Sequence, residues 1–309
     1  DLRARVEALP PDVACAQDLR RLEHIVTQHG LLDLRQALAS ILDRVAEREF
    51  EVAIFGRVSS GKSSLLNQLL GAPVLPIGVL PVTSVPTRIR GGAQPRLLVT
   101  DADGRESHVP VARIGEFVTE EGNPGNAKRL TRLVVEYPGS HLPPGVTFVD
   151  TPGLGSLATA GAVQTLAYLP RCDRGTLLVE ASAPLGEEDV EVVAALREAG
   201  ISASVLLSKA DLLSAADLAR VQRHVTRQLA DRLGAEVEVR PVSAMPEHHH
   251  LLAAWIAHDV SPLAGQARPA AREALAAKVQ VLKRRVDALA ARARAEGAVL
   301  AIGPEGGWT

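Results

Sequence analysis

The sequence predicts an α/β fold in which a mostly parallel sheet is covered by helices, with a helical bundle formed by the two ends of the chain. Two observations predict this architecture. Short apolar runs alternate with helical stretches in the middle of the chain, which is the pattern of a parallel sheet. On either side, apolar residues recur every three or four positions, as on one face of a helix. We therefore predict N-terminal bundle helices at 1–49, an αβ domain at 50–260, and a C-terminal bundle helix with a tail at 261–309.

Composition limits the classes of function. The chain has 309 residues, of which 46% are hydrophobic and 23% are charged, enough for one large core and an accessory element. A formal net charge of -2 predicts no general affinity for nucleic acid. No stretch approaches the roughly 18 apolar residues of a membrane span, so any membrane contact is expected to be peripheral. Cys15 and Cys172 lie far apart without metal-binding spacing, which favours a reduced, cytoplasmic protein.

Two apolar stripes mark the terminal helices. The first lies in residues 12–48, a helix interrupted near Gly30, and the second in residues 270–296. Each stripe either covers the sheet or packs against the other, and we favour a separate bundle because both lie outside the αβ region. The stripe residues are Leu31, Leu34, Leu38, Ile41 and Val45 in the first, and Leu275, Val279, Leu282, Val286 and Leu289 in the second.

The central region contains the expected strands. They are short runs rich in aliphatic residues, and the segment "DADGRE" between two of the elements has the composition of a hairpin turn. The predicted strands are "EVAIF", "RLLVT", "RLVVEY", "VTFVD", "GTLLVE", "SASVLLS" and "VEVRPVS".

The first strand leads into "GRVSSGKSS", which satisfies the pattern G-x-x-x-x-G-K-[ST] in its required context, after a strand and before a helix that ends near Gly71. Glycines in such a loop let backbone N–H groups surround a phosphate, and the helix N-terminus adds a positive dipole end. Lys62 would neutralise the β and γ phosphate oxygens during catalysis. The residues predicted to contact the nucleotide here are Gly56, Ser59, Ser60, Gly61, Lys62, Ser63 and Ser64.

A second motif, "FVDTPG", supplies the metal site. Asp150 at its strand end is suited to hold Mg²⁺ through water, with the Ser63 hydroxyl as a further ligand. Gly153 is placed to offer its backbone N–H to the γ-phosphate. Mg²⁺ is therefore the expected cofactor.

Two later strand ends select the base. In "VLLSKAD", Lys209 and Asp211 follow an apolar strand, and a carboxylate there accepts from both N1–H and the N2 amine of guanine, a pair of donors that adenine lacks. In "VSAM", the backbone of Ser243 and Ala244 is positioned to contact the guanine O6. Together with the phosphate loop, these motifs predict binding of GTP and GDP.

The ordered motifs resemble those of the dynamin superfamily of large GTPases, and the wording "GRVSSGKSSLLNQLLG", "VLPIGVLPVTSVPTRI" and "DTPGLGS" is similar to its bacterial dynamin-like and mitofusin branch. The resemblance extends over about residues 50–246. It implies that Thr83 coordinates Mg²⁺ and helps to place the attacking water, with Thr87 as the competing assignment. It also implies a neck of helices beside the GTPase domain.

Three residues depart from related GTPases. Ser208 stands where dynamins carry Asn or Thr, which predicts a looser hold on the phosphate loop or the base. Val58 and Leu154 occupy positions where a glutamine orients water in other GTPases. Slow intrinsic hydrolysis is therefore expected. The resemblance implies a remedy, a homodimer through the nucleotide faces, with Ser59 orienting and Arg57 stabilising charge; for Arg57 the alternative is an ordinary solvated arginine.

Two function classes remain open. One is a dynamin-like GTPase in which hydrolysis moves the helical bundle and remodels a membrane, with the protein in the bacterial cytoplasm or peripheral at the inner face of the cell membrane. The other is a regulatory or assembly GTPase, for instance of ribosome maturation, that switches the binding of a partner. Terminal helices on both sides of the GTPase domain favour the first. Dynamins are much longer, so we expect a GTPase-plus-neck fragment or a reduced member, with membrane-binding regions outside this chain.

Overall fold

A computed structural model gives the arrangement of most of the chain. Among the helices that it describes, none combines the length and the apolar character required to cross a bilayer. The described residues are 2–9, 15–28, 31–45, 49–78, 85–139, 141–153, 172–183, 185–264 and 266–295.

The described residues form a nine-stranded sheet in the order β4-β3-β5-β2-β6-β1-β7-β8-β9. Strands β6, β1, β7, β8 and β9 run parallel to one another, so their carboxyl ends share one edge. Strand β2 is antiparallel to β6, and β3 is antiparallel to both β4 and β5. The strands are β1 (Phe50–Gly56), β2 (Thr87–Gly91), β3 (Arg96–Asp101), β4 (Glu106–Val109), β5 (Leu130–Tyr137), β6 (Val146–Asp150), β7 (Arg174–Glu180), β8 (Ser202–Ser208) and β9 (Glu238–Pro241).

Helices cover both faces of this sheet. Apolar residues of α4, α9 and η7 join one core cluster, and those of α7 and α8 join another. The elements are α4 (Lys62–Leu70), η1 (Val111–Arg113), α5 (Gly115–Val118), η2 (Pro124–Asn126), α7 (Glu187–Glu198), η5 (Ala210–Leu212), α8 (Ala215–Leu233), η6 (Pro246–His248), α9 (His249–Trp255), the π-helical turn η7 (Ile256–Val260) and α10 (Ser261–Ala264).

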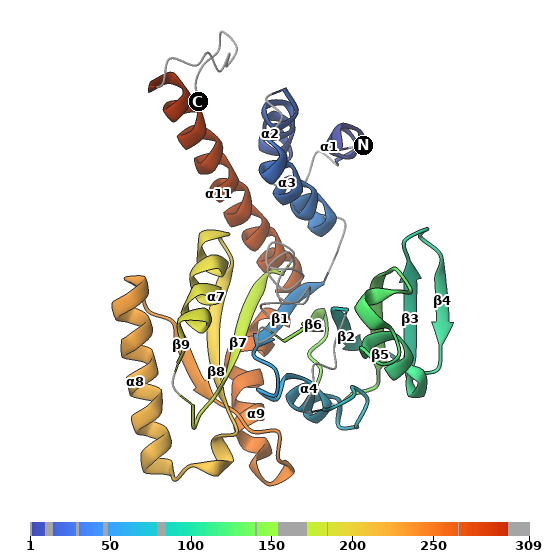
Figure 1. Cartoon of the computed structure of the whole chain (residues 1–309), viewed down its shortest axis with the longest axis vertical. Helices are drawn as coiled ribbons and strands as arrows, with labels where there is room; N and C mark the ends of the chain where they lie inside the picture. The colour runs from blue at the N-terminus through green and yellow to red at the C-terminus, as the bar shows by residue number, and fades with distance from the viewer. Residues whose placement is uncertain are drawn as a thin grey trace.

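The terminal helices pack together and project from the end of the sheet that lies away from α4 (Figure 1). They are α1 (Leu2–Glu7), α2 (Ala16–Gln28), α3 (Leu32–Val45) and α11 (Ala267–Ala295). Their shared core contains Leu19 and Leu38 from the N-terminal helices and Val279 and Val286 from α11. Leu289 departs from the predicted stripe, because it is 41% exposed. The division at residues 49/50 and 260/261 stays a prediction.

All seven predicted strands are present, and "DADGRE" forms the expected hairpin turn. Asp101 accepts from the backbone N–H groups of Asp103 and Arg105 at 2.9 and 3.0 Å, and Gly104 has a φ of 78°. The predicted strands omit β4, most of whose residues are exposed, and also β2. That strand lacks a long apolar run and is stabilised by pairing with β5 and β6, which follow it in the chain.

Candidate nucleotide-binding site

The predicted phosphate loop connects the end of β1 to the start of α4, at the edge where the parallel strands end. Its backbone is unusual at three positions, with φ values of 151° at Gly56, 63° at Ser59 and 95° at Gly61. A Cβ at Gly56 would lie 2.5 Å from the carbonyl oxygen of Leu178. Glycine is therefore required at position 56 by both conformation and space, and at position 61 by conformation.

Lys62 points back over this loop. Its Nζ donates to the carbonyl oxygens of Gly56 and Arg57, each at 2.9 Å. Burial lowers the pKa of Lys62, and the nearby Asp150 carboxylate opposes that shift. A phosphate chain held by the loop would add negative charge beside this buried ammonium and so favour its charged form.

Ser63 and Asp150 meet as the sequence predicts. The Ser63 Oγ donates to Asp150 Oδ2 at 2.8 Å, because β6 lies beside β1 and ends near the start of α4. A hydroxyl and a carboxylate are oxygen ligands of the type that Mg²⁺ prefers. These residues thus fit the expected Mg²⁺, which would neutralise phosphate charge when bound.

Thr83 and Thr87 are the two candidates for the threonine that coordinates Mg²⁺. Thr83 lies outside the described residues. Thr87 belongs to β2, where it is buried and in register with Asp150, and its hydroxyl donates to the carbonyl oxygen of Val85 at 3.2 Å. Thr87 is therefore a buried strand residue whose hydroxyl is bonded to its own backbone segment. The assignment of Thr83 to the metal stays a prediction.

The "DTPG" segment lies against the phosphate loop. The Thr151 hydroxyl donates to the carbonyl oxygen of Ile54 in β1 at 2.7 Å. A Cβ at Gly153 would lie 2.7 Å from a methyl group of Val58 and 3.0 Å from its backbone nitrogen. The backbone of Gly153 is therefore held close to the loop, as its predicted contact with a γ-phosphate requires. Leu154 lies outside the described residues.

Ser208 connects the base motif to the phosphate loop. Its hydroxyl is buried and lies 2.8 Å from the carbonyl oxygen of Ser60 and 3.3 Å from that of Val179, donating to the loop at the shorter distance. Sequence reasoning expected the serine to loosen this connection. The structure instead brings β8 close enough for a short side chain to make it.

The predicted base site is formed by two loops. Asp211 accepts a hydrogen bond from the Ser243 hydroxyl at 2.5 Å, and that hydroxyl accepts from the Met245 N–H at 3.0 Å. Lys209, with a φ of 53°, pairs through its Nζ with Glu180 at 2.8 Å. This hydrogen bond is the main cause that lowers the pKa of Glu180.

Sequence reasoning predicted only backbone contacts from Ser243 and Ala244. The side chain of Ser243 was missed, and so was Glu180, because neither position belongs to a motif that assigns it a partner. The Ser243 hydroxyl contacts Asp211, and Glu180 contacts Lys209. Both contacts orient residues that were predicted to bind the nucleotide.

The orientation of the Arg57 side chain was not predicted from the sequence. Its guanidinium pairs with Asp189 at the start of α7, with Nη2 and Oδ2 3.2 Å apart. No local sequence signal connects these two residues.

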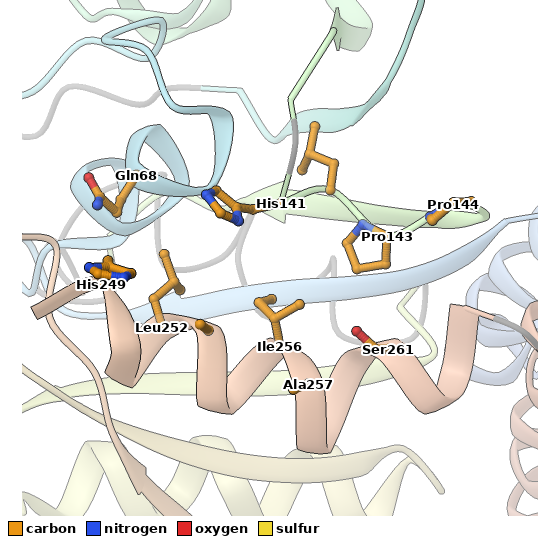
Figure 2. Close-up of a pocket in the computed structure, with 11 residues that line it drawn as sticks. Gln68, His141, Pro143, Pro144, His249, Leu252, Ile256, Ala257 and Ser261 are labelled. Atoms are coloured by element: carbon orange, nitrogen blue, oxygen red, sulfur yellow. The ribbon is translucent and has the colours of Figure 1, made fainter. Parts of the chain in front are cut away.

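A separate cavity of about 440 Å³ lies between α4, the 141–144 segment and α9 (Figure 2). Its lining is mostly apolar, with Gln68, His141, His249 and Ser261 as polar members. None of the predicted nucleotide-site residues lines it. The nucleotide site is therefore distinct from this cavity.

The phosphate loop, the Ser63–Asp150 pair and the Asp211 loop all lie at the carboxyl ends of parallel strands, where open α/β sheets bind their ligands. This arrangement defines a P-loop GTPase.

Comparisons with known proteins give the family. The family model described as "Dynamin family" matches residues 52–200. Dynamin-like protein 2 of Campylobacter jejuni is 33% identical over 180 residues, covering 57% of this chain and 28% of that protein. Isoniazid-induced protein IniC of Mycobacterium tuberculosis is 36% identical over 137 residues, covering 43% of this chain and 27% of that protein. The nucleotide-binding region of this chain is therefore similar to the dynamin family.

Solved structures share the fold over nearly the whole chain. A structure titled as an oligomerised bacterial dynamin pair has a TM-score of 0.54 at 19% identity, and the match covers 95% of this chain and 48% of that one. The chain thus spans less than half the length of each of these three relatives.

Proposed function

We propose that this chain is the GTPase and neck part of a dynamin-like protein that hydrolyses GTP with Mg²⁺ and couples hydrolysis to movement of its helical bundle. The observation that carries the proposal is α11, one continuous helix that contacts both the sheet and the bundle. Ala270 and Ala271 pack against a core cluster of the sheet, whereas Val279 and Val286 belong to the bundle core. A helix shared in this way transmits movement between the two.

The junction between α11 and the sheet is tight. Lys278 pairs with Asp173 at 3.5 Å, and the two side chains are only 3% and 2% exposed. A Cβ at Gly200 would lie 3.0 Å from the carbonyl oxygen of Ala277 and 2.9 Å from a methyl group of Val281. Any displacement at this edge of the sheet is therefore passed to α11.

Strand β1 joins this edge to the nucleotide site. The Asp173 carboxylate accepts from the N–H of Glu51 near the start of β1, at 3.0 Å, and β1 ends in the phosphate loop at Gly56. Its seven residues span about 20 Å. The bundle and the nucleotide thus act on opposite ends of one buried strand.

A second copy of the chain is the proposed activator. Val58 has no hydrogen-bonding group with which to orient water, so a monomer is expected to turn over slowly. We assign Ser59, held at positive φ in the loop, to the orienting contribution across a homodimer. The solved bacterial dynamin pair is described as providing a mechanism for the long-range sensing and tethering of membranes. For this chain we propose peripheral action at the inner face of the cell membrane, with membrane contact made by further segments.

The proposal is tested by the dependence of turnover on protein concentration. The GTPase rate per molecule is expected to rise with concentration, and size-exclusion chromatography with GDP and aluminium fluoride is expected to show a dimer that GDP alone does not produce. Lys62→Ala serves as the control for nucleotide binding. A flat rate and a monomer in every nucleotide state would reject the dimer and favour the regulatory GTPase.

Bundle movement has its own measurement. Dyes on Leu289→Cys in α11 and on His224→Cys in α8 occupy exposed positions, in a background where Cys15 is serine. Energy transfer between them is expected to differ between GDP and GDP with aluminium fluoride. Equal transfer in the two states would show that hydrolysis does not move the bundle.

A further inference from the structure

The side chain of Arg57 is anchored away from its own loop, on the first turn of α7. Its guanidinium is 46% exposed, but the carboxylate that it contacts, Asp189, is only 3% exposed. The same carboxylate oxygen of Asp189 accepts from the N–H of Gly186 at 2.9 Å. Asp189 is therefore a fixed anchor, because the start of a helix and a backbone hydrogen bond both hold it.

The lack of a side chain at Gly186 leaves room for the guanidinium of Arg57. A Cβ at this position would lie 2.0 Å from Arg57 Nη2, and the next atoms would be Arg57 Cζ at 3.2 Å and Asp189 Oδ2 at 3.4 Å. The backbone of Gly186, with φ −86° and ψ 168°, is ordinary extended chain. Its conformation does not require glycine, so the feature that a side chain would disturb is the guanidinium of Arg57. We call Gly186 and Asp189 together the arginine notch.

The backbone carbonyl of Arg57 contacts Lys62, the lysine predicted to bind the phosphates. Its carbonyl oxygen accepts from Lys62 Nζ at 2.9 Å and from the N–H of Ser60 at 3.2 Å. Arg57 thus contacts α7 through its side chain and the Lys62 ammonium through its backbone carbonyl.

We propose that Arg57 is a positioning residue of the phosphate loop, and that the arginine notch holds it in that role. With the side chain anchored on α7, the Arg57 carbonyl is kept where it orients Lys62, so the loop binds the nucleotide without first being ordered. This role is intramolecular, and it differs from the charge-stabilising role across a dimer that the sequence suggested for Arg57. It goes beyond the proposed function, because it operates in a monomer and does not depend on movement of the bundle.

The test compares three variants that weaken the contact between Arg57 and the arginine notch. Gly186→Ala displaces the guanidinium, Asp189→Asn removes the anchoring charge but keeps an oxygen for the Gly186 N–H, and Arg57→Ala removes the side chain. Each is expected to weaken GDP binding by about two- to fivefold, the scale of a half-exposed ion pair. GDP affinity is measured by isothermal titration of the full chain. In GTPase assays, the loss is expected in KM rather than in kcat.

Two further variants control the comparison. Gly91→Ala introduces the same methyl group where nothing lies within 4 Å, and it is expected to bind GDP like the wild type. Adding Gly186→Ala to Arg57→Ala is expected to change nothing further, because the displaced group is already absent. Since the only atoms closer than 3.4 Å to an alanine Cβ at 186 belong to the flexible Arg57 side chain, this variant remains informative even if Asp189→Asn folds poorly.

Two results would overturn the inference. One is wild-type GDP affinity in both Gly186→Ala and Arg57→Ala. The other is a Gly186→Ala protein that behaves like the wild type while Arg57→Ala lowers only the rate reached at high protein concentration, which would place Arg57 on a partner's nucleotide. A wild-type rate that does not depend on concentration would reject the proposed dimer and leave the GDP measurements valid.

Discussion

The buried ion pair between Lys278 and Asp173 should dominate the stability of the junction between α11 and the sheet. Lys278→Met keeps the length of the side chain and removes only its charge. The Asp173 carboxylate then stays buried at the sheet edge with its hydrogen bond from the Glu51 N–H but without the ammonium. The prediction concerns the free energy of unfolding, measured in urea.

The magnitude follows from burial. Removing one member of a buried pair costs about 3–5 kcal/mol. The Nζ–Oδ1 distance of 3.5 Å is long, and Asp173 retains a backbone donor. We therefore expect about 2–3 kcal/mol for Lys278→Met, or a shift of about 1 M in the urea midpoint. Adding Asp173→Asn removes the remaining buried charge of the pair, so the double variant should lose less stability than Lys278→Met alone.

A matched control lies on the same helix. Lys283 pairs with Asp18 at 2.9 Å, but those side chains are 17% and 29% exposed. Lys283→Met should therefore cost about 1 kcal/mol or less. Equal losses for the two lysine variants, or a double variant less stable than Lys278→Met, would refute the argument that burial makes the first pair critical.

Three further predictions concern the nucleotide site. Asp211→Asn should weaken GTP by about 1–3 kcal/mol and shift preference toward xanthine nucleotides, and equal ATP and GTP affinity in the wild type, by titration, would contradict the base assignment. Lys62→Ala should remove most GTP binding, whereas Thr83→Ala should keep binding and lose turnover in a phosphate-release assay; normal turnover would show that another residue serves the metal. Ser208→Ala should lower GDP affinity by about 1 kcal/mol, because the carbonyl of Ser60 loses its buried donor, and an unchanged dissociation constant would show that the loop does not need this hydrogen bond.

The sequence determined the parts of the protein that depend on neighbouring residues. The phosphate loop was readable because its glycines, its lysine and the start of α4 are consecutive, and backbone conformation there depends on local residue types. The turn around Asp101 was readable for the same reason. The apolar stripes predicted terminal helices, because helical periodicity is a local property.

Tertiary structure decided the long-range contacts between residues that no sequence motif pairs. Ser208 reaches the carbonyl of Ser60 from 148 positions away, and Lys278 reaches Asp173 from 105 positions away. Strand β2 was missed because its pairing partners, rather than its composition, stabilise it. Arg57 was predicted as a residue of the site, but the direction of its side chain depended on the position of α7. These contacts arise from how strands and helices stack, and a hydrogen bond or ion pair requires atoms within a few ångströms, a condition that the order of residues along the chain does not specify.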